Sequence, residues 1–140
     1  MGEMRILIVE DDVMVALSMD ETLSEAGHVI VGLAREEVGA MRVAAATRPD
    51  LALIDLKLAR RASGALVAQH LRERHDIPCV FVSGNPGDCQ KVGVHIGVLA
   101  CLAKPFTPEE LVDAVDVASM LLQKQNPERV PANMQLYYLM

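Results

Sequence analysis

The sequence has few cysteines, and none of them are paired in a spacing typical of a metal site. Cys79, Cys89 and Cys101 are odd in number and form no CxxC motif. We therefore expect neither a disulfide framework nor a zinc site. Cys79 and Cys101 lie within apolar runs. Since free cysteines are usually buried, we predict that both are small core residues.

The chain also lacks basic runs, and only 3% of its residues are aromatic. Thirteen Lys and Arg against nineteen Asp and Glu leave a net charge of -6. Because a nucleic-acid interface needs positive charge along a phosphate backbone, we expect no direct DNA binding. The longest apolar stretch, residues 97–103, is about a third of a membrane span, and no signal peptide precedes it. We expect no membrane association and a cytoplasmic location.

The composition that is present is that of one folded domain. The chain has 140 residues, of which 51% are apolar and 23% charged. A disordered chain would contain fewer apolar residues, and a domain of this length can bury one hydrophobic core.

Short apolar runs alternate with segments of helical length. The runs are continuous rather than alternating, which is typical of strands buried on both faces of a parallel sheet. They cover residues 6–9, 29–34, 51–54, 79–82 and 98–103. The pattern predicts an α/β fold with a doubly wound parallel sheet.

Several of the predicted helices have clear end signals. Asp12 can cap a helix over residues 13–26, and Gly27 can close it. The segment that starts Thr107-Pro108-Glu109-Glu110 has a cap residue, a first-turn proline and a glutamate three residues after the cap. By contrast, residues 85–97 contain three glycines and a proline. We expect a short or poorly formed helix there.

Polar side chains follow four of the five predicted strands. Glu10, Asp11 and Asp12 come after the first strand, and the later strands are followed by Asp55, Ser83 and Lys104. Ligands of open parallel sheets bind at the carboxyl ends of the strands. We therefore expect these side chains to share one site, although Asp12 alone could be a helix cap and Asp55 alone a turn residue.

This set of side chains points to phosphoryl chemistry. Two carboxylates about 4 Å apart repel by about 4 kcal/mol at an effective dielectric near 20, so a divalent cation is needed to offset the repulsion. Mg²⁺ bound by one or two carboxylates commonly also holds a phosphate oxygen. Lys104 and Ser83 suit phosphoryl oxygens, and the isolated Asp55 can act as a nucleophile that forms an acyl phosphate.

The motifs Ile6 to Asp12, Leu53-Ile54-Asp55, Val82-Ser83-Gly84 and Lys104-Pro105-Phe106 resemble the receiver domain of two-component response regulators. The resemblance implies a flavodoxin-like five-stranded (βα)5 fold with strand order 2-1-3-4-5. It implies a receiver domain over residues 1–123 and a signalling protein rather than an enzyme, with phosphotransfer from a sensor histidine kinase or a phosphotransfer protein to Asp55.

The same resemblance assigns roles to the site residues. Glu10 and Asp11 match the acidic pair, and Mg²⁺ would be held by Asp11, Asp55 and the backbone carbonyl of Lys57. Ser83 matches the hydroxyl that follows the added phosphoryl group, and Lys104 matches the lysine that pairs with it. The Lys104–Pro105 peptide bond would be cis. Output would come from changed contacts of the face made by the fourth helix, fifth strand and fifth helix.

The chain departs from the family pattern at two places. Cys101 occupies the position of the usual switch aromatic, three residues before the lysine. The loop after Asp55 has Leu58-Ala59 where many members have Met-Pro, and it reaches Gly64 one residue late. That longer loop is similar to receivers associated with general-stress regulators. A switch that moves an aromatic ring at this position is therefore not expected.

The last 17 residues, 124–140, form a tail that we expect to carry no effector domain. Residues 134–140 are mostly apolar, unlike a disordered end. Docking on this domain, on a second copy or on a partner would each explain that. A weak homodimer and an unidentified downstream protein are further expectations.

Two other functions fit parts of the sequence. One is a receiver-like module that binds partners without being phosphorylated. The other is a small Mg²⁺-dependent phosphatase of the haloacid-dehalogenase type with an aspartate nucleophile. The second is disfavoured, because such enzymes need an Asp-x-Asp motif after the first strand and a large cap insertion. Glu10-Asp11-Asp12 in a sequence of 140 residues supplies neither.

Overall fold

The computed structural model describes residues 2–58 and 63–137. The loop difference predicted after Leu58 falls partly on residues 59–62, and the end of the apolar tail falls on residues 138–140. Both lie outside the described residues.

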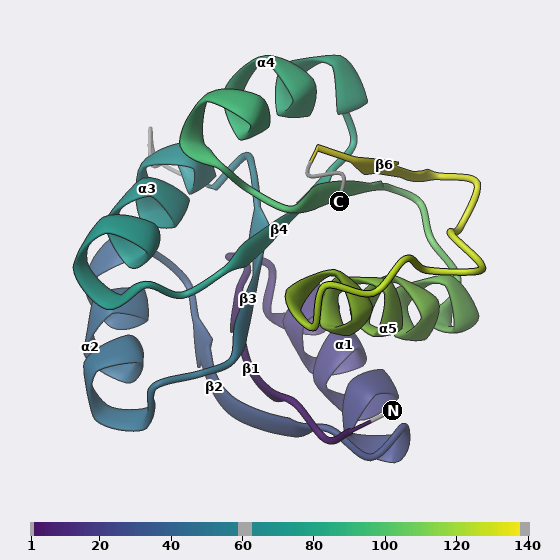
Figure 1. Ribbon diagram of the computed structural model, residues 1–140. Coiled ribbons are helices and arrows are strands. Elements are labelled where there is room, and N and C mark those ends of the chain that lie inside the picture. The colour runs from purple at the N-terminus through teal and green to yellow at the C-terminus, as the bar shows by residue number, and fades with distance from the viewer. Residues whose placement is uncertain (1, 59–62, 138–140) are drawn as a thin grey trace.

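Helices and strands alternate along the described chain, as the sequence predicts. The strands and helices in order are β1 (Arg5–Val9), α1 (Val13–Glu25), β2 (Val29–Ala34), α2 (Glu37–Thr47), β3 (Leu51–Asp55), α3 (Gly64–His75), β4 (Cys79–Ser83), α4 (Pro86–Ile96), β5 (Ala100–Ala103), α5 (Pro108–Leu122) and β6 (Met134–Leu136). The sheet order is β2-β1-β3-β4-β5-β6, with the first five strands parallel. The α/β fold with strand order 2-1-3-4-5 is therefore confirmed, and a sixth strand is added to it (Figure 1).

Two helical layers cover the sheet and create two apolar clusters. α1 and α5 pack on one face, and α2, α3 and α4 on the other (Figure 1). Successive strand residues point to opposite faces. Ile6 and Ile8 join the α1 and α5 cluster, whereas Leu7 and Val9 join the other. Every residue of β3 and β4 is buried, as expected for central strands.

The edge strand β2 departs from the expected burial on both faces. Of its six residues, only Ala34 is buried, because β2 has a strand neighbour on one side only.

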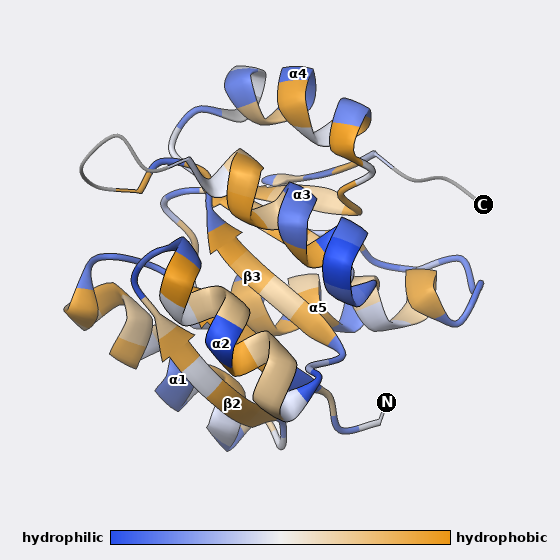
Figure 2. Cartoon of the chain, turned by 90° about the vertical axis from the view of Figure 1, so that its left-hand side faces the viewer, coloured by the Kyte–Doolittle hydropathy of each residue, from blue (hydrophilic) through white to orange (hydrophobic). Residues whose placement is uncertain are grey.

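The strands and the inward helix faces are mainly hydrophobic, while the hydrophilic residues lie mostly on the outer helix faces and loops (Figure 2). In the described ranges no helix combines the length and apolar character needed to cross a membrane.

The predicted helix caps are present. The Asp12 carboxylate accepts hydrogen bonds from the amides of Met14 and Val15 at 3.0 and 3.3 Å. Thr107 and Glu110 form a reciprocal capping box, with distances of 3.1 and 2.8 Å. Both helices therefore begin where the sequence predicts, because their first amides find local partners.

The prediction of a poorly formed helix over residues 85–97 is wrong. α4 has 11 residues, the Asn85 side chain accepts from the Asp88 amide, and Gly97 ends the helix with a φ of 84°. Cys89 is fully buried, and Val92 and Ile96 pack against the same cluster. This tertiary packing outweighs the low helix propensity of the glycines, about 1 kcal/mol each.

The prediction of no disulfide is also wrong, since Cys89 and Cys101 are bonded to each other. The bond joins α4 to β5, and the two Cα atoms are 6.4 Å apart. The two cysteines are 12 residues apart, and nothing in this spacing predicts that they pair. They meet because α4 packs on β5.

The burial of Cys79 and Cys101 is confirmed. Burial raises the pKa of the free Cys79 thiol to about 12, so this thiol is unreactive.

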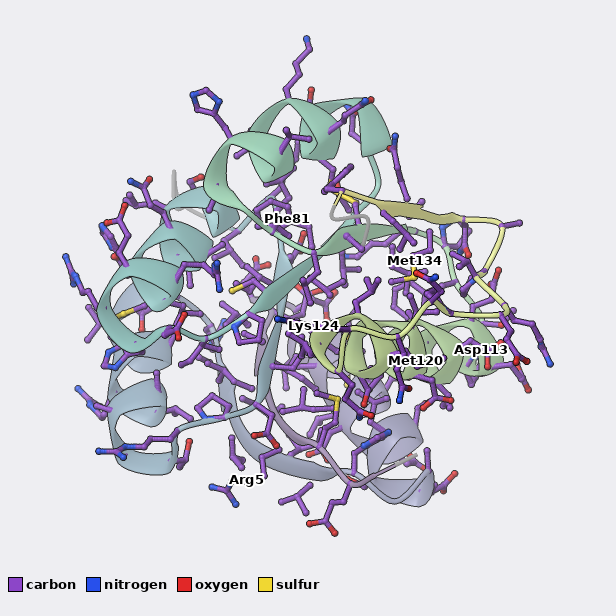
Figure 3. All side chains as sticks on the ribbon, in the orientation of Figure 1. Arg5, Phe81, Asp113, Met120, Lys124 and Met134 are labelled. Atoms are coloured by element: carbon purple, nitrogen blue, oxygen red, sulfur yellow. A yellow bond between two sulfur atoms is a disulfide. The ribbon has the colours of Figure 1, made fainter. Side chains whose placement is uncertain are left out.

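The tail docks on the domain itself and supplies β6. This strand runs antiparallel to β5, pairing Leu102 with Met134 and Ala100 with Leu136. Met134 is buried in the cluster that α5 covers, between β6 and that helix (Figure 3). Phe81 lies on the other side of the sheet beneath α4. Of the three explanations open from the sequence, the structure shows docking on the chain's own sheet.

Candidate functional site

Three carboxylates gather where β1 and β3 end. One carboxylate oxygen from each of Glu10, Asp11 and Asp55 lies within 4.8 Å of the others. They meet because β1 and β3 are neighbouring parallel strands, with Val9 opposite Ile54. Glu10 is 3% exposed and Asp55 is 8% exposed, so little water is available to screen their charges.

Lys104 lies against this cluster from the end of β5. Its Nζ atom donates to Glu10 Oε1 at 3.1 Å and to Asp55 Oδ2 at 3.4 Å. The Lys104 amide donates to the Ser83 carbonyl oxygen at 2.8 Å, which fixes the residue beside β4. The Lys104–Pro105 peptide bond is cis, as predicted.

The charges of the site act on one another. Burial, together with Asp55 as a hydrogen-bond partner and neighbouring charge, raises the pKa of Glu10 from 4.5 to about 7. Burial by itself would lower the pKa of Lys104, but Asp55 and Glu10 outweigh it and raise this pKa. Among the residues that the structure describes, Lys104 donates to two of the three carboxylates of this cluster. The excess negative charge and the hard oxygen donors fit a divalent cation such as Mg²⁺.

Ser83 is the last residue of β4, and its hydroxyl forms hydrogen bonds with Asn85 rather than with Asp55. Its hydroxyl accepts from the Asn85 amide at 2.9 Å and donates to the Asn85 carbonyl oxygen at 3.4 Å. Because Asn85 also caps α4, the hydroxyl is linked to the start of that helix.

Lys57 contributes its backbone rather than its side chain. The Lys57 amide donates to Asp55 Oδ1 at 3.1 Å. Its ammonium group is exposed and lies 4.0 Å from Asp88, an ion pair that contributes little in water. The chain just after Asp55 therefore turns back over the carboxylate.

Sequence reasoning missed an apolar surface beside the site. A groove of about 630 Å³ lies between α1 and the segment that follows β5. Its lining is Met14, Val15, Ser18, Met19, Lys104, Pro105 and Phe106. Val13, Met14 and Leu17 on α1 are about half exposed or more. Their apolar character on a helix beside the acidic cluster is the signal that could have indicated this surface.

The chain is similar to known proteins over most of its length. The family model of the response regulator receiver domain matches residues 6–116. The transcriptional regulatory protein PdtaR of Mycobacterium tuberculosis is 31% identical over 81% of this chain and 56% of its own length. The phyllosphere-induced regulator PhyR of Methylorubrum extorquens is 30% identical over 91% of this chain and 48% of its own length. The chain thus spans about half the length of these curated relatives.

A solved structure shows the same fold. A CheY-like response regulator receiver domain protein from Methanospirillum hungatei superposes with a TM-score of 0.78, at 22% sequence identity. The match covers 88% of this chain and 98% of that one.

Proposed function

The chain belongs to the response regulator receiver domain family, and from this premise we propose that Asp55 accepts a phosphoryl group from a histidine kinase or a phosphotransfer protein. The observation that carries the proposal is the convergence of Glu10, Asp11, Asp55 and Lys104 at one sheet edge. In this proposal the protein is a signalling protein, whose only chemistry is its own phosphorylation and dephosphorylation.

Asp55 is the nucleophile of the proposed reaction. One of its carboxylate oxygens forms a bond to phosphorus while the bond between phosphorus and the donor's histidine nitrogen breaks, and that nitrogen leaves with the electron pair. Mg²⁺, held by Asp11, Asp55 and the Lys57 carbonyl with Glu10 alongside, would offset the charge of the phosphoryl oxygens. Lys104, already 3.4 Å from Asp55, pairs with an oxygen of the transferred group.

Ser83 and Asn85 connect the site to α4. When the Ser83 hydroxyl turns toward a phosphoryl oxygen on Asp55, it gives up its two hydrogen bonds to Asn85. Asn85 caps α4, so the start of this helix changes with the site. The signal then leaves through altered protein contacts of the face formed by α4, β5 and α5.

The groove beside Lys104 suits the phosphodonor protein. It is mainly apolar, is open to solvent and includes Lys104 in its lining. A donor that covers Met14 and Phe106 would bring its phosphohistidine to the cluster and exclude water from it. The cytoplasmic location and the division of the chain at residue 123 stay predictions, as do an unidentified downstream protein and a weak homodimer.

The proposal is tested with acetyl phosphate and Mg²⁺, followed by intact mass measurement. We expect one added phosphoryl group on the native protein and none on Asp55→Asn. The matched control is Asp12→Asn, because Asp12 is also an acid beside the cluster but caps α1, a role that asparagine retains. Chelation of Mg²⁺ should abolish the adduct, and an adduct that persists in Asp55→Asn would refute the proposal.

A second candidate is a receiver-like module that binds partners without phosphorylation. It is favoured by Cys101, which is disulfide-bonded and buried at the position where the family has its switch aromatic. In the same experiment this module would acquire no phosphoryl group. A phosphatase would consume acetyl phosphate without a lasting adduct.

A further inference from the structure

The tail reaches the backbone on both sides of Lys104 through one residue, Asn133. The Asn133 carbonyl oxygen accepts from the Ala103 amide at 2.8 Å. Its side-chain Nδ2 donates to the Ala103 carbonyl oxygen at 3.1 Å and to the Pro105 carbonyl oxygen at 3.4 Å. Asn133 therefore makes three hydrogen bonds to the two residues that flank Lys104.

Asn133 is held in this place because the strand after it is anchored. The Tyr137 amide donates to the Leu99 carbonyl oxygen at 2.9 Å, and Met134 is buried. The Tyr137 ring packs against Gly93 of α4 so closely that a Cβ atom at residue 93 would lie 2.6 Å from it. Gly93 is thus a notch in the helix that the ring fills.

We propose that Asn133 is a positioning residue for Lys104, an inference that rests on the proposed phosphorylation of Asp55. The Lys104 amide is held from the β4 side by the Ser83 carbonyl oxygen, and the residues on both sides of Lys104 are held from the β6 side by Asn133. The lysine side chain itself is long and flexible, so the position of its ammonium group depends on where its backbone is fixed. Small displacements of a charged group weaken its interaction with a reacting group strongly. Asn133 touches neither Asp55 nor the phosphoryl group and acts through Lys104.

The test measures how tightly the full chain binds beryllofluoride, a phosphoryl mimic, in the presence of Mg²⁺. Asn133→Ala removes both hydrogen bonds donated by Nδ2, and we expect the half-saturating concentration to rise about fivefold. Asn133→Asp should raise it at least as much, because a carboxylate of the same shape cannot donate to the Ala103 and Pro105 carbonyl oxygens. The matched control is Gln135→Ala, because Gln135 is an exposed residue of β6 two positions after Asn133, and this variant should bind like the native protein.

A double-mutant cycle with Lys104→Ala separates positioning from general destabilisation. If Asn133 acts through Lys104, Asn133→Ala has no further effect on beryllofluoride affinity once Lys104 is alanine. Equal weakening in both backgrounds would overturn the proposal, and so would native affinity in Asn133→Ala. If the native protein bound no beryllofluoride at all, both this inference and the proposed function would fail. Should Asn133→Asp not fold, the cycle with alanine alone decides the question.

Discussion

Replacing Gly64 with alanine should destabilise the protein and displace Asp55. A Cβ atom at residue 64 would lie 2.1 Å from the Asp55 carbonyl oxygen and 2.8 Å from Leu56 Cα. Both neighbours are backbone atoms, so relief requires the chain at the phosphoacceptor to move. Overpacking of this kind costs about 1–3 kcal/mol. Displacement would also weaken the 3.0 Å hydrogen bond from the Gly64 amide to the Leu56 carbonyl oxygen. Loss of this bond would lower the free energy of unfolding by about 1 kcal/mol more.

The expected loss of unfolding free energy is therefore about 2–4 kcal/mol, which lowers the melting temperature by about 3 °C per kcal/mol in a domain of this size. Denaturant unfolding measures the loss, and intact mass after acetyl phosphate treatment reports the displacement of Asp55 as slower phosphorylation.

The matched control is Gly87→Ala. Gly87 also lies in the first turn of a helix, and its Cβ would come no closer than 3.5 Å to Asn85 Oδ1, an ordinary contact. This variant should change stability by less than about 1 kcal/mol. Equal stabilities of the two variants would refute the steric argument for residue 64.

Three further predictions concern Glu10, Met134 and Thr107. The pKa of Glu10 is raised to about 7, so the folded protein binds the proton of this carboxyl more tightly than the unfolded chain does. The protonated carboxyl therefore adds on the order of 3 kcal/mol to the free energy of unfolding below pH 4.5, and this stabilisation is lost as the pH rises through 7. Without Mg²⁺, the native protein should lose more unfolding free energy than Glu10→Gln between pH 5 and 8; parallel profiles would contradict this. Met134→Ala should cost about 2–3 kcal/mol in denaturant unfolding by opening the core under β6, whereas the exposed Gln135→Ala should cost almost nothing. Thr107→Ala should cost about 1 kcal/mol by removing the α5 cap, and an unchanged melting temperature would count against it.

Much of the candidate site could be predicted because its members lie at the carboxyl ends of parallel strands. Glu10, Asp55 and Lys104 each come directly after an apolar run, and Asp11 follows Glu10. In a parallel sheet those positions share one edge, so side chains separated by 94 residues, as Lys104 and Glu10 are, come into contact. The continuous apolar runs and the parallel sheet that they predict were sufficient for this inference.

The direction of each polar side chain was not predictable in the same way. The Ser83 hydroxyl bonds to Asn85 rather than facing Asp55. The resemblance to the family assigns Ser83 a role, but the orientation of a hydroxyl depends on the acceptors and donors near it in space.

The sequence by itself determined the features that depend on neighbours a few residues away or on regular repetition. These are the α1 and α5 caps, the buried central strands and the polar residues at one sheet edge. Only the tertiary structure decided the length of α4, the bond between Cys89 and Cys101, and the placement of Asn133 around Lys104. The physical reason is that these features depend on packing between a helix, a strand and the tail. The local sequence of each of these segments does not indicate which other segment it contacts. Asn133 and Ala103 are 30 residues apart, and their contact exists because β6 pairs with the open edge of β5.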